Sequence, residues 1–141
     1  MRDLPGKLSA EELAELFEGR TRFVERLAEL PDPLRRAREL AASLTDEEKR
    51  EVLDAHPAIG AKRLSTRSAA EQGADEAPEL DELNRLYEAR FGFRFVVFVD
   101  RRPKRELVSV LRARLGRTRE QELATALDEL VSIAEDRWRR S

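Results

Sequence analysis

The sequence predicts an all-α fold, a single-domain multi-helix bundle with one short buried extended segment. Capping boxes, in which Ser or Thr precedes Glu or Gln by three residues, recur along the chain. Apolar residues follow most of them at helical spacing. Residues 93–99 form the one β-like run, and a lone strand cannot pair its backbone in a sheet. We therefore expect that run to be a buried connector within a bundle.

Four helices are expected in the first 55 residues. The first begins at the capping box of Ser9 and ends near Gly19. The second carries an apolar stripe, and the third opens at Asp32, an N-cap, followed by Pro33 in the first turn. The fourth begins at the capping box of Thr45. The residues expected to face inward are Leu13, Leu16, Phe17, Phe23, Val24, Leu27, Leu30, Leu34, Ala37, Leu40, Ala41, Leu44, Val52 and Leu53.

Three further helices are expected after a loop over residues 57–77, which has a short helical turn near residues 68–72. Pro78 opens a helix that Gly92 closes at its C′ position. Pro103 begins the next helix and Gly116 ends it, and Thr118 caps the last and longest one. The predicted inward residues are Leu80, Leu83, Tyr87, Phe91, Leu107, Val108, Leu111, Leu115, Leu123, Ala126, Leu127, Leu130, Val131, Ala134 and Trp138.

The amino-acid composition limits the kinds of function that the chain can have. A chain of 141 residues suits one domain over residues 1–141, and 40% apolar with 40% charged residues suits amphipathic helices. The net charge of −2 gives no field that favours nucleic acid or an anionic membrane. With no cysteine and one histidine, thiolate chemistry, disulfides and Cys- or His-rich metal sites are excluded. Without a signal region or membrane span, we expect a cytoplasmic protein that binds neither nucleic acid nor membrane.

His56 is the only histidine, and two interpretations of it stand side by side. Pro57 disfavours helical dihedrals at His56, so a helix should end there. A histidine at a helix end is often a partner of the helix dipole or a surface residue. Alternatively, its ordinary pKa near neutrality makes it the side chain best suited to proton transfer in this chain.

A second polar cluster follows in the expected loop. Ser68 and Glu71 have the spacing of a capping box, which is the structural interpretation. However, Gln72 and Gly73 follow rather than a long apolar-periodic helix. A hydroxyl, a carboxylate and an amide within five residues suit a ligand rich in amide donors and acceptors, which is the functional interpretation.

Several short motifs in order carry a family resemblance. They are His56-Pro57, Ser68-x-x-Glu71-Gln72, Leu83-Asn84-x-x-Tyr87, and Arg90-Phe91-Gly92-Phe93-x-Phe95-Val96, followed by Arg114-Leu115, Glu122, Ala126, Ile133 and Arg137. With them the chain resembles the OHCU decarboxylase family, the 2-oxo-4-hydroxy-4-carboxy-5-ureidoimidazoline decarboxylases of urate breakdown. The likeness runs from about Leu13 to Trp138.

The resemblance implies an all-helical carboxy-lyase that needs no cofactor or metal, is usually a homodimer, and converts OHCU to (S)-allantoin. It implies that His56 and Glu71 are catalytic, with His56 as general acid or base. It implies further substrate contacts from Pro57, Ser68, Glu71, Gln72, the backbone of Phe95, Val96, Val97, Phe98 and Val99, and Arg137. Arg137 would contact the substrate carboxylate, and Glu71 and Gln72 would bind the ureido and ring amides.

Departures from the family pattern keep alternatives open. Arg94 stands where the family commonly has proline between two phenylalanines, and the spacing from His56 to Ser68 is short. These differences bear on pocket size and substrate rather than on the fold. One alternative is a sibling enzyme acting on another ureido or carboxylated ring. Another is a helical interaction module, in which His56 would point into solvent and an exposed apolar patch would dock a partner.

Overall fold

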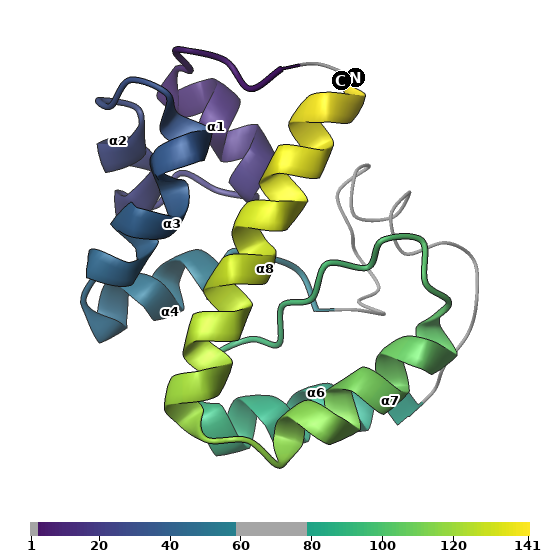
Figure 1. Ribbon diagram of the computed structural model, residues 1–141. Helices are drawn as coiled ribbons and strands as arrows, with labels where there is room; N and C mark the ends of the chain where they lie inside the picture. The colour runs from purple at the N-terminus through teal and green to yellow at the C-terminus, as the bar shows by residue number, and fades with distance from the viewer. Residues whose placement is uncertain (1–2, 59–78) are drawn as a thin grey trace.

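Within residues 3–58 and 79–141, which the computed structural model describes, the chain forms seven helices and no strand (Figure 1). The predicted all-α class is confirmed. The helices are α1 (Ala10–Phe17), α2 (Arg22–Leu27), α3 (Pro33–Ser43), α4 (Asp46–Asp54), α6 (Glu79–Phe91), α7 (Lys104–Leu115) and α8 (Arg119–Arg140). No helix in this part of the chain is long and apolar enough to cross a membrane.

Helix α8 is the axis of the bundle. Its 22 residues span about 33 Å at the usual helical rise. Helices α1, α3 and α4 pack against it, and α6 pairs with α7 across its N-terminal end (Figure 1). The first described residues lie close to the end of α8, where Trp138 Nε1 donates to the carbonyl of Asp3 at 2.7 Å. The end of α8 therefore lies near the segment that precedes α1.

The helix starts follow the sequence signals with one exception. Ser9, Thr45 and Thr118 all cap through their side chains, each reciprocated by the Glu or Gln three residues later. Thr21 caps α2 in a similar way, without the reciprocal bond. Asp32 does occupy the N-cap position of α3, but its φ of 49° is left-handed and its side chain makes no capping bond. The expectation of an aspartate cap was therefore right in position and wrong in mechanism.

Two helices end on residues with left-handed backbone. The stop of α1 was expected near Gly19, but Glu18 takes the left-handed conformation, with φ of 64°. Such a conformation is unfavourable for a residue with a Cβ. At the end of α6, the prediction is confirmed, since Gly92 has φ of 82° and its N–H donates to the carbonyl of Glu88. Glu18 is thus an exception that the surrounding contacts must stabilise.

The expected buried connector is confirmed. Residues 93–99 are extended without belonging to a strand, and most of their side chains are buried. Phe93 and Phe95 each meet the ring of Tyr87 edge-on, at centroid distances of 5.8 and 5.1 Å. Phe91 packs on Tyr87 at 4.6 Å. This aromatic cluster packs the first part of the connector against α6.

Candidate active site

His56 follows directly after the end of α4. The helix ends at Asp54, with Ala55 as C-cap, so the predicted helix end before Pro57 is confirmed. The His56 side chain is only 4% exposed. Within the described residues its Nε2 is buried without a hydrogen-bond partner. A buried polar atom in that state is uncommon and calls for an explanation. The interpretation of His56 as a surface residue is therefore wrong.

Burial and nearby charges keep the His56 imidazole neutral. Its pKa is lowered from 6.5 to about 3, first by burial, then by the positive charge of Arg137 and, more weakly, of Arg94. The carboxylate of Glu18 opposes this shift. At neutral pH the imidazole therefore carries no charge and can accept a proton.

Arg137, on α8, is the charged neighbour of His56 that the resemblance singled out. Its side chain is 3% exposed. Nη1 donates to the carbonyl of Leu16 at 3.1 Å, and Nη2 pairs with Oε1 of Glu18 at 3.0 Å. The left-handed turn at Glu18 brings that carboxylate to the guanidinium. His56 and Arg137 are buried and Glu18 is partly buried, and the charges of Arg137 and Glu18 shift the pKa of His56 in opposite directions.

The carbonyl groups of residues 95–99 were expected to be available to a ligand, but three already accept bonds from arginines. Arg114 Nη1 donates to Val96 O at 2.9 Å. The guanidinium of Arg102 donates to Phe98 O at 2.6 Å and to Val99 O at 3.1 Å. These arginine donors replace the strand neighbour that a sheet would provide.

A buried ionic network supports Arg114. Glu122 is fully buried and accepts from Arg114 Nε at 2.7 Å, from Tyr87 Oη at 2.6 Å and from Arg117 Nη1 at 2.8 Å. The Arg114 guanidinium also lies 4.6 Å from the centroid of the Phe95 ring. A buried charge pair requires such satisfaction, because ions lose their hydration on burial. This network fixes the position of the Val96 carbonyl.

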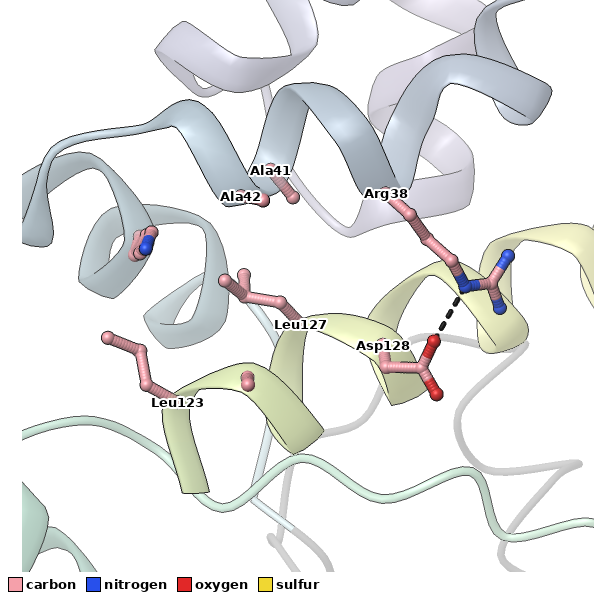
Figure 2. Close-up of a pocket in the computed structure, with 8 residues that line it drawn as sticks. Arg38, Ala41, Ala42, Leu123, Leu127 and Asp128 are labelled. Atoms are coloured by element: carbon pink, nitrogen blue, oxygen red, sulfur yellow. Dashed lines mark hydrogen bonds and ion pairs between the residues drawn. The ribbon is translucent and has the colours of Figure 1, made fainter. Parts of the chain in front are cut away.

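Three pockets within the described residues are lined by residues other than His56. One of about 110 Å³ is lined by Val97, Phe98 and Val99 together with residues of α8. A wider one of about 470 Å³ adjoins it, again with Phe98 against the end of α8. A groove of about 270 Å³ between α3, α4 and α8 is apolar apart from Lys49 and the Arg38–Asp128 ion pair at its rim (Figure 2). Only the first two adjoin a segment predicted to bind substrate.

The predicted site residues divide into two groups. His56, Pro57, Arg137 and the connector are described, and the charge of Arg137 is close enough to His56 to lower its pKa. Ser68, Glu71 and Gln72 lie outside the described residues. In the described ranges, no group of three or more His, Cys, Asp or Glu side chains is arranged to hold a metal ion.

Sequence reasoning gave no site role to Glu18, Arg102 or Arg94. It named Arg114 and Glu122 only as matches to the family pattern. One signal was present for Glu122: it lies four residues before Ala126, in the inward stripe of α8. A charge at a buried helical position needs a partner. The bonds of Arg102 and Arg94 to backbone carbonyls have no such local signature.

Comparisons with known proteins agree on one family. The family model for OHCU decarboxylase matches residues 3–139. The chain is 34% identical over 114 residues to a 2-oxo-4-hydroxy-4-carboxy-5-ureidoimidazoline decarboxylase of Haloferax volcanii, covering 74% of this chain and 68% of that protein. It is 32% identical over 137 residues to a uric acid degradation bifunctional protein of Bacillus subtilis, covering 86% of this chain but 28% of that protein.

Two solved structures share the fold. A crystal structure of OHCU decarboxylase in the presence of (S)-allantoin superposes with a TM-score of 0.73 at 23% identity, covering 89% of this chain and 94% of that chain. A crystal structure of (S)-allantoin synthase superposes with a TM-score of 0.67 at 22% identity, covering 91% of this chain and 47% of that chain. At these identities the likeness concerns the arrangement of helices.

Proposed function

The chain belongs to the OHCU decarboxylase family, and from that premise we propose that it is a carboxy-lyase that converts OHCU to (S)-allantoin in urate breakdown. The observation that carries the proposal is the buried imidazole of His56, whose Nε2 has no partner among the described residues and whose neighbour is the Arg137 guanidinium. Together they offer a proton acceptor and a fixed positive charge in a site shielded from water. An anionic substrate that must lose CO₂ needs both.

The lowered pKa of His56 keeps its imidazole unprotonated at neutral pH, which is the form that can act as a base. The carboxylate of OHCU leaves from a ring carbon that bears a hydroxyl and adjoins an imine. When that C–C bond breaks, its electron pair stays in the ring and spreads over the imine. Neutral His56 takes the hydroxyl proton, which leaves a carbonyl group at that carbon. A proton delivered to one face of the neighbouring ring carbon then gives (S)-allantoin.

The same environment favours return of the proton. Burial and Arg137 make the His56 imidazolium a stronger acid than free imidazolium, since its pKa is lowered to about 3. A protonated His56 therefore gives up its proton readily. A positioned acid or base of this kind accounts for about 10²- to 10⁴-fold in rate. His56 can thus serve as base first and as acid afterwards.

The remaining parts of the proposed site follow the resemblance. Arg137 attracts the substrate carboxylate through its buried charge while Glu18 and the Leu16 carbonyl hold its guanidinium in place. Pro57 and the connector backbone at Phe95, Val96, Val97, Phe98 and Val99 contact the ring. Ser68, Glu71 and Gln72 bind the ureido and amide groups, and Glu71 assists catalysis. No cofactor takes part in this scheme.

The test is an assay with freshly generated OHCU. Wild-type protein is expected to consume it without added metal and to produce optically active (S)-allantoin, measured by circular dichroism. The His56→Gln variant is expected to lose about 10²- to 10⁴-fold in kcat because the proton acceptor is gone. Wild-type protein without activity on OHCU would refute the substrate. A fully active His56→Gln variant would refute the role of His56.

The proposal also covers the oligomeric state of the protein and its location in the cell. We propose a homodimer and a cytoplasmic location, both on the family resemblance alone. Light scattering after gel filtration measures the mass of the species in solution, and a monomer that retains full activity would contradict the dimer.

The alternative function is that of a sibling enzyme with another substrate, because Arg94 departs from the family pattern. Assays with other ureido- or carboxyl-substituted rings would reveal it.

A further inference from the structure

Arg94 connects the extended connector to the end of α4. Its backbone N–H donates to Oδ1 of Asp54 at 2.9 Å. Its Nη1 donates to the carbonyl of His56 at 2.6 Å and to the carbonyl of Asp54 at 3.1 Å. The Arg94 side chain is only 30% exposed, and its Nε lies 3.4 Å from Oε1 of Glu88. One side chain thus holds two carbonyl groups of the segment that carries His56.

These bonds satisfy a general need of helix ends. The last carbonyl groups of an α-helix have no partner within the helix, and a positive charge there is favourable to the helix dipole. Arg94 supplies both the donors and the charge to α4, although it lies 38 residues after His56 in the sequence. It therefore acts as a C-terminal cap that comes from another element.

The cap matters because the imidazole nitrogen Nε2 is not held by a hydrogen bond within the described residues. The position of the His56 backbone therefore contributes to the direction of the imidazole. Arg94 fixes that backbone through the His56 carbonyl.

We propose that Arg94 is a positioning residue for His56, which holds the end of α4 so that the imidazole keeps its place and direction in the site. The inference rests on the proposed function of His56 as the proton-transfer residue. It also gives a use to the residue that departs from the family pattern. A proline in that position has neither the N–H nor the side-chain donors for these bonds.

Arg119 provides a matched control. Its Nε donates to a backbone carbonyl, that of Phe91, at 2.9 Å, and its Nη1 pairs with Asp46 at 2.6 Å. It therefore also joins one helix to another through a carbonyl and an ion pair. Its contacts with Phe91, Asp46 and the Phe93 ring involve neither His56 nor the residues next to it. Its loss measures what a comparable arginine contributes to the fold alone.

The experiment compares Arg94→Gln, Arg94→Lys and Arg119→Gln with wild type. Steady-state kinetics with OHCU give kcat and kcat/KM. The ¹⁵N chemical shifts of the imidazole at pH 7 report on His56 directly, because the chain has one histidine. Thermal unfolding checks that each variant is folded. The spectroscopic measurement needs no substrate, so it tests the inference even if OHCU is not turned over.

Arg94→Gln is expected to lower kcat and kcat/KM together by about 10- to 100-fold, because small misplacements of a catalytic group have effects of this size. Its imidazole shifts should move away from those of wild type. Arg94→Lys keeps a charged donor for the carbonyls and should recover part of the rate and of the shifts. Arg119→Gln should keep both the rate and the shifts.

Several results would overturn the inference. One is a folded Arg94→Gln variant with wild-type imidazole shifts. Another is a set of losses in Arg94→Gln that Arg119→Gln reproduces, since the role would then be stability alone. If Arg94→Gln does not fold, Arg94→Lys decides: altered imidazole shifts together with lowered turnover support the role, and a change in only one of the two, or in neither, refutes it. An inactive wild type whose shifts change in Arg94→Gln refutes the substrate and leaves the positioning supported.

Discussion

Lowering the pH from 7 to 5 should destabilise this protein through His56. In the folded chain the pKa of His56 is lowered to about 3 by burial and by Arg137, whereas the unfolded chain has the ordinary value of 6.5. Between these two values the unfolded state binds a proton that the folded state rejects. The contribution to stability is therefore complete above pH 6.5 and is lost progressively as the pH falls towards 3.

The loss of stability depends on how far the pH lies below the pKa of His56 in the unfolded chain. Each pH unit below 6.5 lowers the free energy of unfolding by about 1.4 kcal/mol until the folded pKa is reached. At pH 5 this amounts to about 2 kcal/mol relative to pH 7. The loss is a substantial part of the ~5–15 kcal/mol that stabilises an ordinary domain. Glu48, whose pKa is lowered to about 2 by its capping bond with Thr45 and by Arg26, titrates at lower pH.

The assay is urea unfolding of wild type and His56→Gln at pH 7, 6 and 5. The variant carries no imidazole, so its free energy of unfolding should change little over this interval. The wild-type loss of about 2 kcal/mol should therefore appear as a difference between the two proteins. Equal pH dependence in both would mean that His56 is solvated and titrates normally. That result would refute the buried neutral imidazole on which the proposed base rests.

Three changes elsewhere test the supporting structure. Glu122→Gln should lower the free energy of unfolding by about 3–5 kcal/mol, because Arg114 would be left buried without its counter-charge. Urea unfolding measures this free energy, and a loss below about 1 kcal/mol would contradict the prediction. Tyr87→Phe removes one bond to that carboxylate and should lose about 1.5–3 kcal/mol in the same assay, and an unchanged value would contradict the bond. Gly92→Ala should lower the free energy of unfolding by about 1 kcal/mol, because its backbone is left-handed. Gly116 has φ of −85°, so Gly116→Ala should stay near wild type. Equal losses in the two variants would contradict this explanation.

The helices were predictable because their signals are local. A capping box places its two side chains within one turn, and the inward stripe repeats within each helix. The starts at Ser9, Thr45 and Thr118 and the end at Gly92 follow from those rules alone. The connector followed from an equally simple argument, since a single β-like run has no strand to pair with.

The site was predictable only in part, because its contacts join residues far apart in the sequence. His56 stood out as the only histidine, and Arg137 came from the family resemblance. Nothing local to Glu18 shows that its left-handed turn directs its carboxylate to Arg137, 119 positions later. Likewise, the bond from Arg94 to the His56 carbonyl depends on how the connector passes the end of α4.

Arginine side chains explain how an all-helical protein holds an extended segment at its site. Arg114, Arg102 and Arg94 each donate from a planar guanidinium to backbone carbonyls, on Val96, on Phe98 and Val99, and on His56. A sheet would provide such donors through a neighbouring strand, which the described residues lack. The fixed geometry of the guanidinium group makes it suited to this use, and the compact ammonium group of lysine reproduces it only in part. The connector and the end of α4 are therefore held by side chains from outside the segments that they position, and replacing one such arginine should disturb the site more than the fold.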